Sequence, residues 1–164
     1  MEIKTLILKN EEIKTIKDTE TLIQLFYFEY LKKDRGALVL LEGNLGAGKT
    51  MISKMIGAFM GIQEEINSPS FVVYNMYKND SMVFFHYDLY RIHPLEIEEM
   101  ELRELWYDVY DNLFTIHCVE WWKKAKTIES SLPIYLVQLK IIQDLESDFK
   151  RKIYIYKINQ NYYE

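Results

Sequence analysis

The sequence predicts a three-layer α/β domain with a mixed parallel and antiparallel sheet. Short apolar runs of strand length alternate with longer segments whose apolar residues recur at helical spacing. That alternation is typical of a sheet covered by helices. The chain has 164 residues, the length of one domain. No linker, internal repeat or low-complexity segment divides it, so residues 1–164 are expected to form a single domain.

Seven apolar runs have the length and residue types of strands. The expected strands are, in order, residues 4–9, 37–42, 70–77, 82–89, 114–121, 134–142 and 151–158. The second is apolar almost throughout, which is typical of a strand buried on both faces. The fifth is also expected to be of this buried type. Residues 78–81 are expected to join the third and fourth as a hairpin, and a charged turn at 143–150 to separate the last antiparallel pair. The order of the strands in the sheet is not readable from the sequence.

Three segments with helical character lie between these strands. The first is expected to be capped by Asp18 or Thr19 and to run to about residue 33. The second covers residues 50–60, and Gly61 is a suitable residue to end it. The third is an acidic segment that Pro94 opens and that runs to about residue 105, because proline is well tolerated in a first helical turn.

Composition excludes several classes of protein. Hydrophobic residues make up 49% and charged residues 27% of the chain, which excludes a disordered protein. No uncharged stretch reaches the ~20 apolar residues that a bilayer requires, and the first residues do not resemble a signal peptide, so no membrane role is expected. The single Cys118 cannot form an internal disulfide, which favours a reducing, cytoplasmic setting. The net charge of −5 gives no global attraction to nucleic acid.

Three of the six glycines fall within residues 43–50, which read Gly-Asn-Leu-Gly-Ala-Gly-Lys-Thr and match the phosphate-binding pattern G-x-x-x-x-G-K-[ST]. Gly43 and Gly48 permit backbone angles that a Cβ would block, so amide groups can point at phosphate oxygens. Lys49 can reach the β- and γ-phosphates, and the Thr50 hydroxyl can ligate Mg²⁺. The match lies between an expected strand and an expected helix, the context that supports it. The fold is therefore expected to be P-loop NTPase-like.

The loop alone does not name the reaction. The D-x-x-G and N-K-x-D patterns that GTPases need do not occur in the sequence. Kinases of small molecules usually carry several arginines on a mobile lid, whereas the four arginines of this chain are scattered along its length. These observations favour ATP with Mg²⁺ as the ligand and water as the acceptor.

Two carboxylates end expected strands and are candidates for the acidic partner of Mg²⁺, Asp88 and Glu120. His86 shares the side of its strand with Asp88 and is either a proton relay or, as the interpretation we favour, a structural histidine. The segment at residues 68–71 is either a simple turn or a switch that senses the γ-phosphate through Ser70. One of the adjacent Trp121 and Trp122 is expected to line the nucleotide pocket or a partner contact.

Taken together, four segments resemble the TsaE family, formerly YjeE, in the same order and at similar spacing. They are the phosphate loop, Ser68-Pro-Ser-Phe71, His86-Tyr-Asp-Leu-Tyr-Arg91 and Val119-Glu-Trp121. The resemblance extends over about residues 19–151. Members of this family are small bacterial ATPases required for threonylcarbamoyladenosine modification of tRNA. They act with TsaB and TsaD, so the resemblance implies these partners and only an indirect contact with tRNA.

The resemblance also implies roles for individual residues. Lys49 would bind the phosphates of ATP, Thr50 and Glu120 would hold Mg²⁺, and Asp88 would be needed for hydrolysis, so the expected catalytic residues are Lys49, Asp88 and Glu120. Asp148 to Arg151 is a further segment that would approach the base. The expected nucleotide-binding residues are Thr21, Gly43, Leu45, Gly46, Ala47, Gly48, Lys49, Thr50, Met51 and Trp121.

The sequence departs from the family pattern at a few positions. Glu101 stands where glycine is common in the family, Trp122 where proline is common, and Asn44, Met51 and Ser70 where the family usually has Asp, Thr and Thr. Two other functions stay open beside the one that the resemblance implies: a small-molecule kinase on the same P-loop fold, and a nucleotide-gated binding module whose hydrolysis is not essential.

Overall fold

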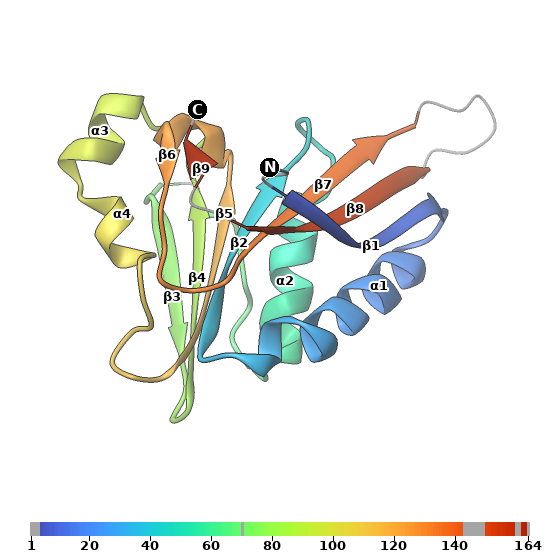
Figure 1. Ribbon diagram of the computed structural model, residues 1–164, viewed down its shortest axis with the longest axis horizontal. Coiled ribbons are helices and arrows are strands. Elements are labelled where there is room, and N and C mark those ends of the chain that lie inside the picture. Colours follow the sequence, from blue (N-terminus) through green and yellow to red (C-terminus); the bar gives the residue numbers. More distant parts are fainter. Residues whose placement is uncertain (1–3, 70, 143–149, 160–161, 164) are drawn as a thin grey trace.

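A seven-stranded mixed sheet forms the centre of the computed structural model, which describes residues 4–69, 71–142, 150–159 and 162–163 (Figure 1). Four central strands run parallel to one another, and the antiparallel strands lie at the two sides. In spatial order the strands are β1 (Lys4–Ile13), β8 (Arg151–Ile158), β7 (Ile134–Ile141), β2 (Gly36–Glu42), β5 (Phe114–Glu120), β4 (Met82–Asp88) and β3 (Tyr74–Lys78).

Helices cover both faces of this sheet, which confirms the three-layer prediction (Figure 1). α1 (Ile16–Glu29) and α2 (Lys49–Phe59) lie on one face, and α1 is followed by the 3₁₀ turn η1 (Leu31–Lys33). The other face carries α3 (Pro94–Glu99), α4 (Leu102–Leu105) and the 3₁₀ turn η2 (Trp122–Ala125). A small second sheet pairs β6 (Thr127–Ile128) with β9 (Tyr162–Tyr163).

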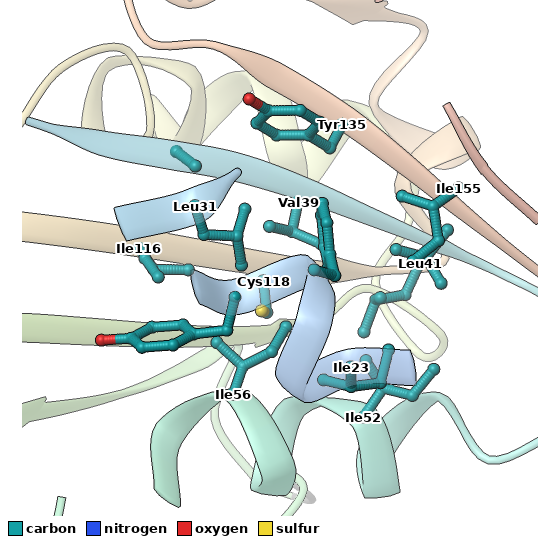
Figure 2. Packing of buried hydrophobic residues seen from close by; sticks show 14 of the residues in the cluster. Ile23, Leu31, Val39, Leu41, Ile52, Ile56, Ile116, Cys118, Tyr135 and Ile155 are labelled. Atoms are coloured by element: carbon teal, nitrogen blue, oxygen red, sulfur yellow. The ribbon is translucent and has the colours of Figure 1, made fainter. Parts of the chain in front are cut away.

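The alternation of side chains along β2 separates two hydrophobic cores. Val39 and Leu41 point into the core under α1 and α2, which Figure 2 shows together with Ile52 and Ile56 of α2. Leu38 and Leu40 belong to the core on the other face. Because both faces of β2 are covered, the strand is apolar almost throughout, as the sequence predicts.

The first helix begins earlier than predicted. Its N-cap is Thr15, whose hydroxyl accepts from the backbone N–H of Asp18, while the Asp18 carboxylate accepts from the backbone N–H of Thr15. Asp18 is therefore the third residue of a capping box and not the cap itself, and Thr19 is buried inside the helix. The prediction that Asp18 or Thr19 caps the helix was wrong by one turn.

The predicted helix after Pro94 is interrupted. Residues 94–99 and 102–105 form two short helices, and Glu101 between them has φ of +53°. A helix cannot pass through a left-handed residue, so the chain turns there. The element was predicted in the right place but as one helix.

The other boundaries agree closely with the prediction, except at three places. β1 extends to Ile13 and not to residue 9, and α1 ends at Glu29, before the 3₁₀ turn that reaches Lys33. The small sheet of β6 and β9 was not predicted. β3 begins at Tyr74 and not at residue 70, and Phe71 before it is 99% exposed. Ser70 and most of the charged turn expected at 143–150 lie outside the described residues. No helix in the described part of the chain is long and apolar enough to cross a membrane.

Candidate nucleotide-binding site

The phosphate loop follows the central parallel strand β2 and leads into α2. Because β2, β4 and β5 are parallel, the loop lies at the same edge of the sheet as the carboxyl ends of β4 and β5, where Asp88 and Glu120 end their strands. This edge is the usual ligand-binding edge of an open α/β sheet. The topology therefore brings three segments that are far apart in the sequence to one place.

Left-handed backbone angles occur at the second and third glycines of the loop, Gly46 (φ +78°) and Gly48 (φ +101°). Gly43 has no positive φ, and its role is space: a Cβ there would lie 2.9 Å from the Cβ of Ala47 and 3.0 Å from the carbonyl oxygen of Leu139. Gly43 thus permits close packing and not an unusual backbone angle, which corrects the expectation for this residue. Gly48 caps α2 without a side chain, so the amides of the first helical turn face the loop.

Lys49 is held inside the loop. Only 5% of the residue is exposed, and its Nζ donates to the carbonyl oxygens of Gly43 at 2.7 Å and Asn44 at 3.1 Å. The same ammonium lies 4.2 Å from the centre of the Trp121 ring, within the range of a cation–π contact. Burial lowers the pKa of Lys49, and the negative charges of Glu120 and Asp88 oppose that shift.

Thr50 and Glu120 are joined directly. The Thr50 hydroxyl donates to Glu120 Oε1 at 2.9 Å, and the same oxygen lies 2.8 Å from Nε2 of His86. Glu120 is 3% exposed and His86 is fully buried. A hydroxyl and a carboxylate side by side are the hard oxygen ligands that Mg²⁺ prefers. Mg²⁺ is usually bound by one or two carboxylates together with phosphates and water. Among the described residues, no group of three or more His, Cys, Asp or Glu side chains is placed to hold a metal ion.

Asp88 is oriented by two hydrogen bonds. Ser68 Oγ donates to Asp88 Oδ2 at 2.8 Å, and the backbone N–H of Tyr90 donates to Oδ1 at 3.0 Å. Ser68 therefore contacts the acid, whereas the sequence analysis singled out Ser70 of the same segment, which lies outside the described residues. No pattern in the sequence points to Ser68 for this role.

A cavity of about 290 Å³ lies beside the loop and the two carboxylates. Its size is close to the lower limit of ligand pockets, roughly 300 Å³, which suits a phosphate chain better than a whole nucleotide. The cavity is lined by Leu45, Gly46, Gly48, Lys49, Thr50, Ser68, Asp88, Tyr90, Glu120 and Trp121.

Four predicted nucleotide-binding residues do not line this cavity. Gly43 lines an adjacent cleft of about 590 Å³ between the start of the loop, η2 and the end of β7. Ala47 is buried in the loop, and Met51 lies in the first turn of α2. Thr21 is on the exposed side of α1, where its hydroxyl donates to the carbonyl oxygen of Lys17 at 2.9 Å.

The C-terminal segment that the resemblance places near the base is described only in part. Asp148 lies outside the described residues. Arg151, the first residue of β8, lies against the loop, because a Cβ on Gly48 would be 2.3 Å from its Nη1. Burial lowers the pKa of Arg151.

The two adjacent tryptophans lie in different surroundings. Trp121 has φ of +59° and lines the cavity, whereas Trp122 is 4% exposed and belongs to the core. The Trp121 ring also packs on Tyr90, with 4.8 Å between the ring centres.

The sequence analysis missed Tyr90 and Lys124. The Lys124 ammonium donates to the carbonyl oxygens of Tyr90 and Ile92. Tyr90 lies only two residues after Asp88, a signal that could have been used, but nothing in the sequence points to Lys124.

Comparison with known proteins gives consistent results. The family model "Threonylcarbamoyl adenosine biosynthesis protein TsaE" matches residues 13–153. A relative of that role from Rickettsia typhi is 35% identical over 130 residues, 78% of this chain and 83% of the relative. One from Bacillus subtilis is 32% identical over 127 residues, 77% of this chain and 73% of the relative. Both are named tRNA threonylcarbamoyladenosine biosynthesis protein TsaE.

Other matches are shorter. A relative of the same name from Synechocystis is 38% identical over 95 residues, which is 58% of this chain and 60% of the relative. For the Nostoc relative the match covers 52% of its length. The chain thus aligns with little more than half of these two proteins.

A solved structure supports the fold. The crystal structure of Bacillus subtilis YdiB superposes with a TM-score of 0.65 and 20% identity, over 94% of this chain and 88% of YdiB. Since the family model covers most of the chain and relatives above 30% identity cover more than two thirds of it, the chain belongs to the TsaE family.

Proposed function

We propose that this protein binds ATP with Mg²⁺, hydrolyses it slowly, and acts with TsaB and TsaD homologues in the threonylcarbamoyladenosine modification of tRNA. The observation that carries the proposal is the meeting of Lys49, the Thr50–Glu120 pair and the Ser68–Asp88 pair at one cavity beside a complete phosphate loop. The names of the curated relatives supply the process. The partners are those that the family resemblance implies.

Each group has a chemical task in this proposal. The loop amides and Lys49 bind the β- and γ-phosphates, and Thr50 and Glu120 hold Mg²⁺, which neutralises charge on those phosphates. Asp88 has spare lone pairs on both oxygens and can accept a hydrogen bond from a water molecule that attacks the γ-phosphorus. The bond between that phosphorus and the β–γ bridging oxygen breaks, ADP leaves, and the proton of the water passes to Asp88 or to solvent.

Charge supports an indirect role in the tRNA reaction. The chain carries a net charge of −5, so tight binding of tRNA by the protein alone is not part of the proposal. A cytoplasmic location is part of it, supported by the single, buried cysteine Cys118.

The test is ATP turnover by the purified protein, alone and after addition of TsaB and TsaD. Turnover should be slow alone and should rise with the partners. Lys49→Ala should abolish both rates, and Glu120→Ala should weaken the Mg²⁺-dependent hydrolysis. Lys54→Ala is the matched control, because Lys54 is an exposed lysine on the same helix and does not line the cavity.

Two outcomes would contradict the proposal. Transfer of the γ-phosphate to a small acceptor, without a response to the partners, would identify a kinase. If Asp88→Asn stopped hydrolysis but left tRNA modification intact over many turnovers, the protein would be a nucleotide-gated binding module and not an ATPase subunit.

A further inference from the structure

His86 is a fully buried imidazole in the middle of β4, between two buried aromatic residues, Phe85 and Tyr87. Within the described part of the chain its Nδ1 has no hydrogen-bond partner. A buried polar atom without a partner costs about 1–3 kcal/mol, and an apolar side chain at this position would avoid that cost. The contribution of the imidazole at this position therefore comes through its other nitrogen.

That other nitrogen contacts the acidic residue of the phosphate site. His86 Nε2 lies 2.8 Å from Glu120 Oε1, the same oxygen to which the Thr50 hydroxyl donates at 2.9 Å. A carboxylate oxygen can only accept, so the imidazole carries its proton on Nε2. Two donors from two elements, α2 and β4, thus converge on one oxygen of Glu120. Among the described residues no donor contacts the second oxygen, Oε2.

The register of the sheet explains why His86 can do this. In the parallel pair β4–β5, Asp88 lies opposite Glu120 and His86 lies opposite Cys118. His86 is therefore one pleat behind Glu120 on the same face of the sheet, the face that α2 covers. From that position it reaches the carboxylate from behind while Thr50 reaches it from the helix.

We propose that His86 is a positioning residue that holds the Glu120 carboxylate in the orientation in which it receives Mg²⁺. The terminal torsion of a glutamate is broad, so a carboxylate held by Thr50 alone can rotate. The second bond from His86 fixes Oε1 and leaves Oε2 for the metal or a water bound to it. Residues that support a metal ligand in this way typically change metal affinity 10–100-fold when they are removed. This inference rests on the Mg²⁺ site of the proposed function.

The test uses Mn²⁺ as the metal and ADP as the nucleotide, with bound Mn²⁺ measured by electron paramagnetic resonance. His86→Leu removes the donor and keeps an apolar side chain in the strand. It should weaken Mn²⁺ binding to the protein–ADP complex about 10–100-fold. Affinity for ADP in EDTA should stay unchanged. His86→Gln, whose amide can replace the Nε2 donor, should recover part of the loss.

His117→Leu is the matched control, because His117 is an equally buried imidazole in the neighbouring strand that bonds to Tyr87 and Asp108 and not to the site. It should leave Mn²⁺ affinity unchanged. Wild-type Mn²⁺ affinity in His86→Leu, or equal losses in His86→Leu and His86→Gln, would overturn the inference.

Two further measurements keep the result decisive. If His86→Leu fails to fold, His86→Gln takes its place, and its effect on Mn²⁺ affinity is measured both in the wild-type protein and in a Glu120→Gln protein. A loss of Mn²⁺ affinity that persists in the Glu120→Gln background would show that His86 does not act through Glu120. A wild-type protein that binds ADP but no Mn²⁺ would contradict the metal site of the proposed function, and the inference with it. If instead the wild type and His86→Leu bind Mn²⁺ equally well, only the inference about His86 is contradicted.

Discussion

Two glycines of the phosphate loop have left-handed backbone angles, and only one of them lies against another side chain. A Cβ on Gly46 would meet no atom within 4 Å, whereas a Cβ on Gly48 would meet the Arg151 guanidinium. An L-residue in the left-handed region costs roughly 1–2 kcal/mol in either position. The guanidinium is the far end of a flexible side chain and can move, so the additional effect at Gly48 should appear at the site more than in global stability.

We expect Gly48→Ala to weaken ADP binding more than Gly46→Ala, because only the former displaces Arg151 from the loop. Both should lower the free energy of unfolding by about 1 kcal/mol in urea titrations. Gly61→Ala is the control: Gly61 has φ of +79° with open space around it, but it lies at the far end of α2. It should lose the same stability and no ADP affinity. Equal ADP affinities for the two loop variants would show that Arg151 does not support the loop.

A second residue-scale prediction concerns pH. His117 is buried, its Nε2 donates to the carbonyl oxygen of Asp108, and its Nδ1 accepts from the Tyr87 hydroxyl. Burial lowers its pKa from 6.5 to about 4. The unfolded chain therefore takes up a proton near pH 6.5 that the folded protein resists until about pH 4. The stabilisation is complete above pH 6.5 and declines through that window, by roughly 3 kcal/mol in total.

Urea unfolding at pH 7.5 and pH 4.5 measures this decline. Carboxylates also titrate in this range, so the informative quantity is the difference between the wild type and His117→Phe. The variant should be less stable at pH 7.5, because Tyr87 and Asp108 lose a partner, but its stability should fall less on acidification. An identical fall in both proteins would show that His117 does not titrate in this way.

At the residue scale, what the sequence could predict depended on how local the signal was. The phosphate loop is eight consecutive residues, so Lys49 and Thr50 could be assigned directly. Asp88 and Glu120 could be chosen as candidates because each lies at the end of an apolar strand. The roles of Ser68 and His86 depend on the strand register and on how the 68–71 segment approaches Asp88. The sequence does not encode these distances in any short pattern.

One helix prediction failed because a backbone angle, and not hydrophobic spacing, decides where the helix is interrupted. The acidic segment after Pro94 has no glycine or proline in its interior, so its spacing predicts one continuous helix. The break comes from Glu101, which takes φ of +53°. The available signal was that the family commonly has glycine at the position of Glu101, because glycine adopts this angle without strain.

We expect Glu101→Gly to stabilise the protein by about 1 kcal/mol, since it relieves a left-handed glutamate. Glu99→Gly is the matched control, an exposed glutamate at the end of α3 with helical backbone. It should destabilise by up to about 1 kcal/mol, because glycine is a poor helix former. Urea titrations of both variants measure the two changes. A loss of stability in Glu101→Gly would mean that the glutamate side chain contributes more than its backbone angle costs.

At the scale of the whole molecule, the layers were predictable and the strand order was not. The apolar run at β2 indicates cover on both faces, and its alternating side chains do enter two separate cores. The order β1-β8-β7-β2-β5-β4-β3 depends on which strands meet across long stretches of chain. No local pattern specifies such pairings. The site is nevertheless built from the loop after β2 and the ends of β4 and β5, so it exists only when the central sheet is assembled.

Because the site requires the assembled sheet, nucleotide binding should stabilise the whole fold. A ligand that binds only the folded state at 100 times its Kd stabilises it by about 2.7 kcal/mol, which should raise the Tm of a chain of this length by roughly 5–10 °C. Lys49→Ala should show no shift with ADP and Mg²⁺, and replacing Mg²⁺ with EDTA should reduce the shift of the wild type. Because residues 1–164 are expected to form one domain, far-UV circular dichroism and tryptophan fluorescence should report one coincident transition that moves as a unit. Two transitions, of which ADP moves only one, would show that part of the chain folds independently of the sheet that carries the site.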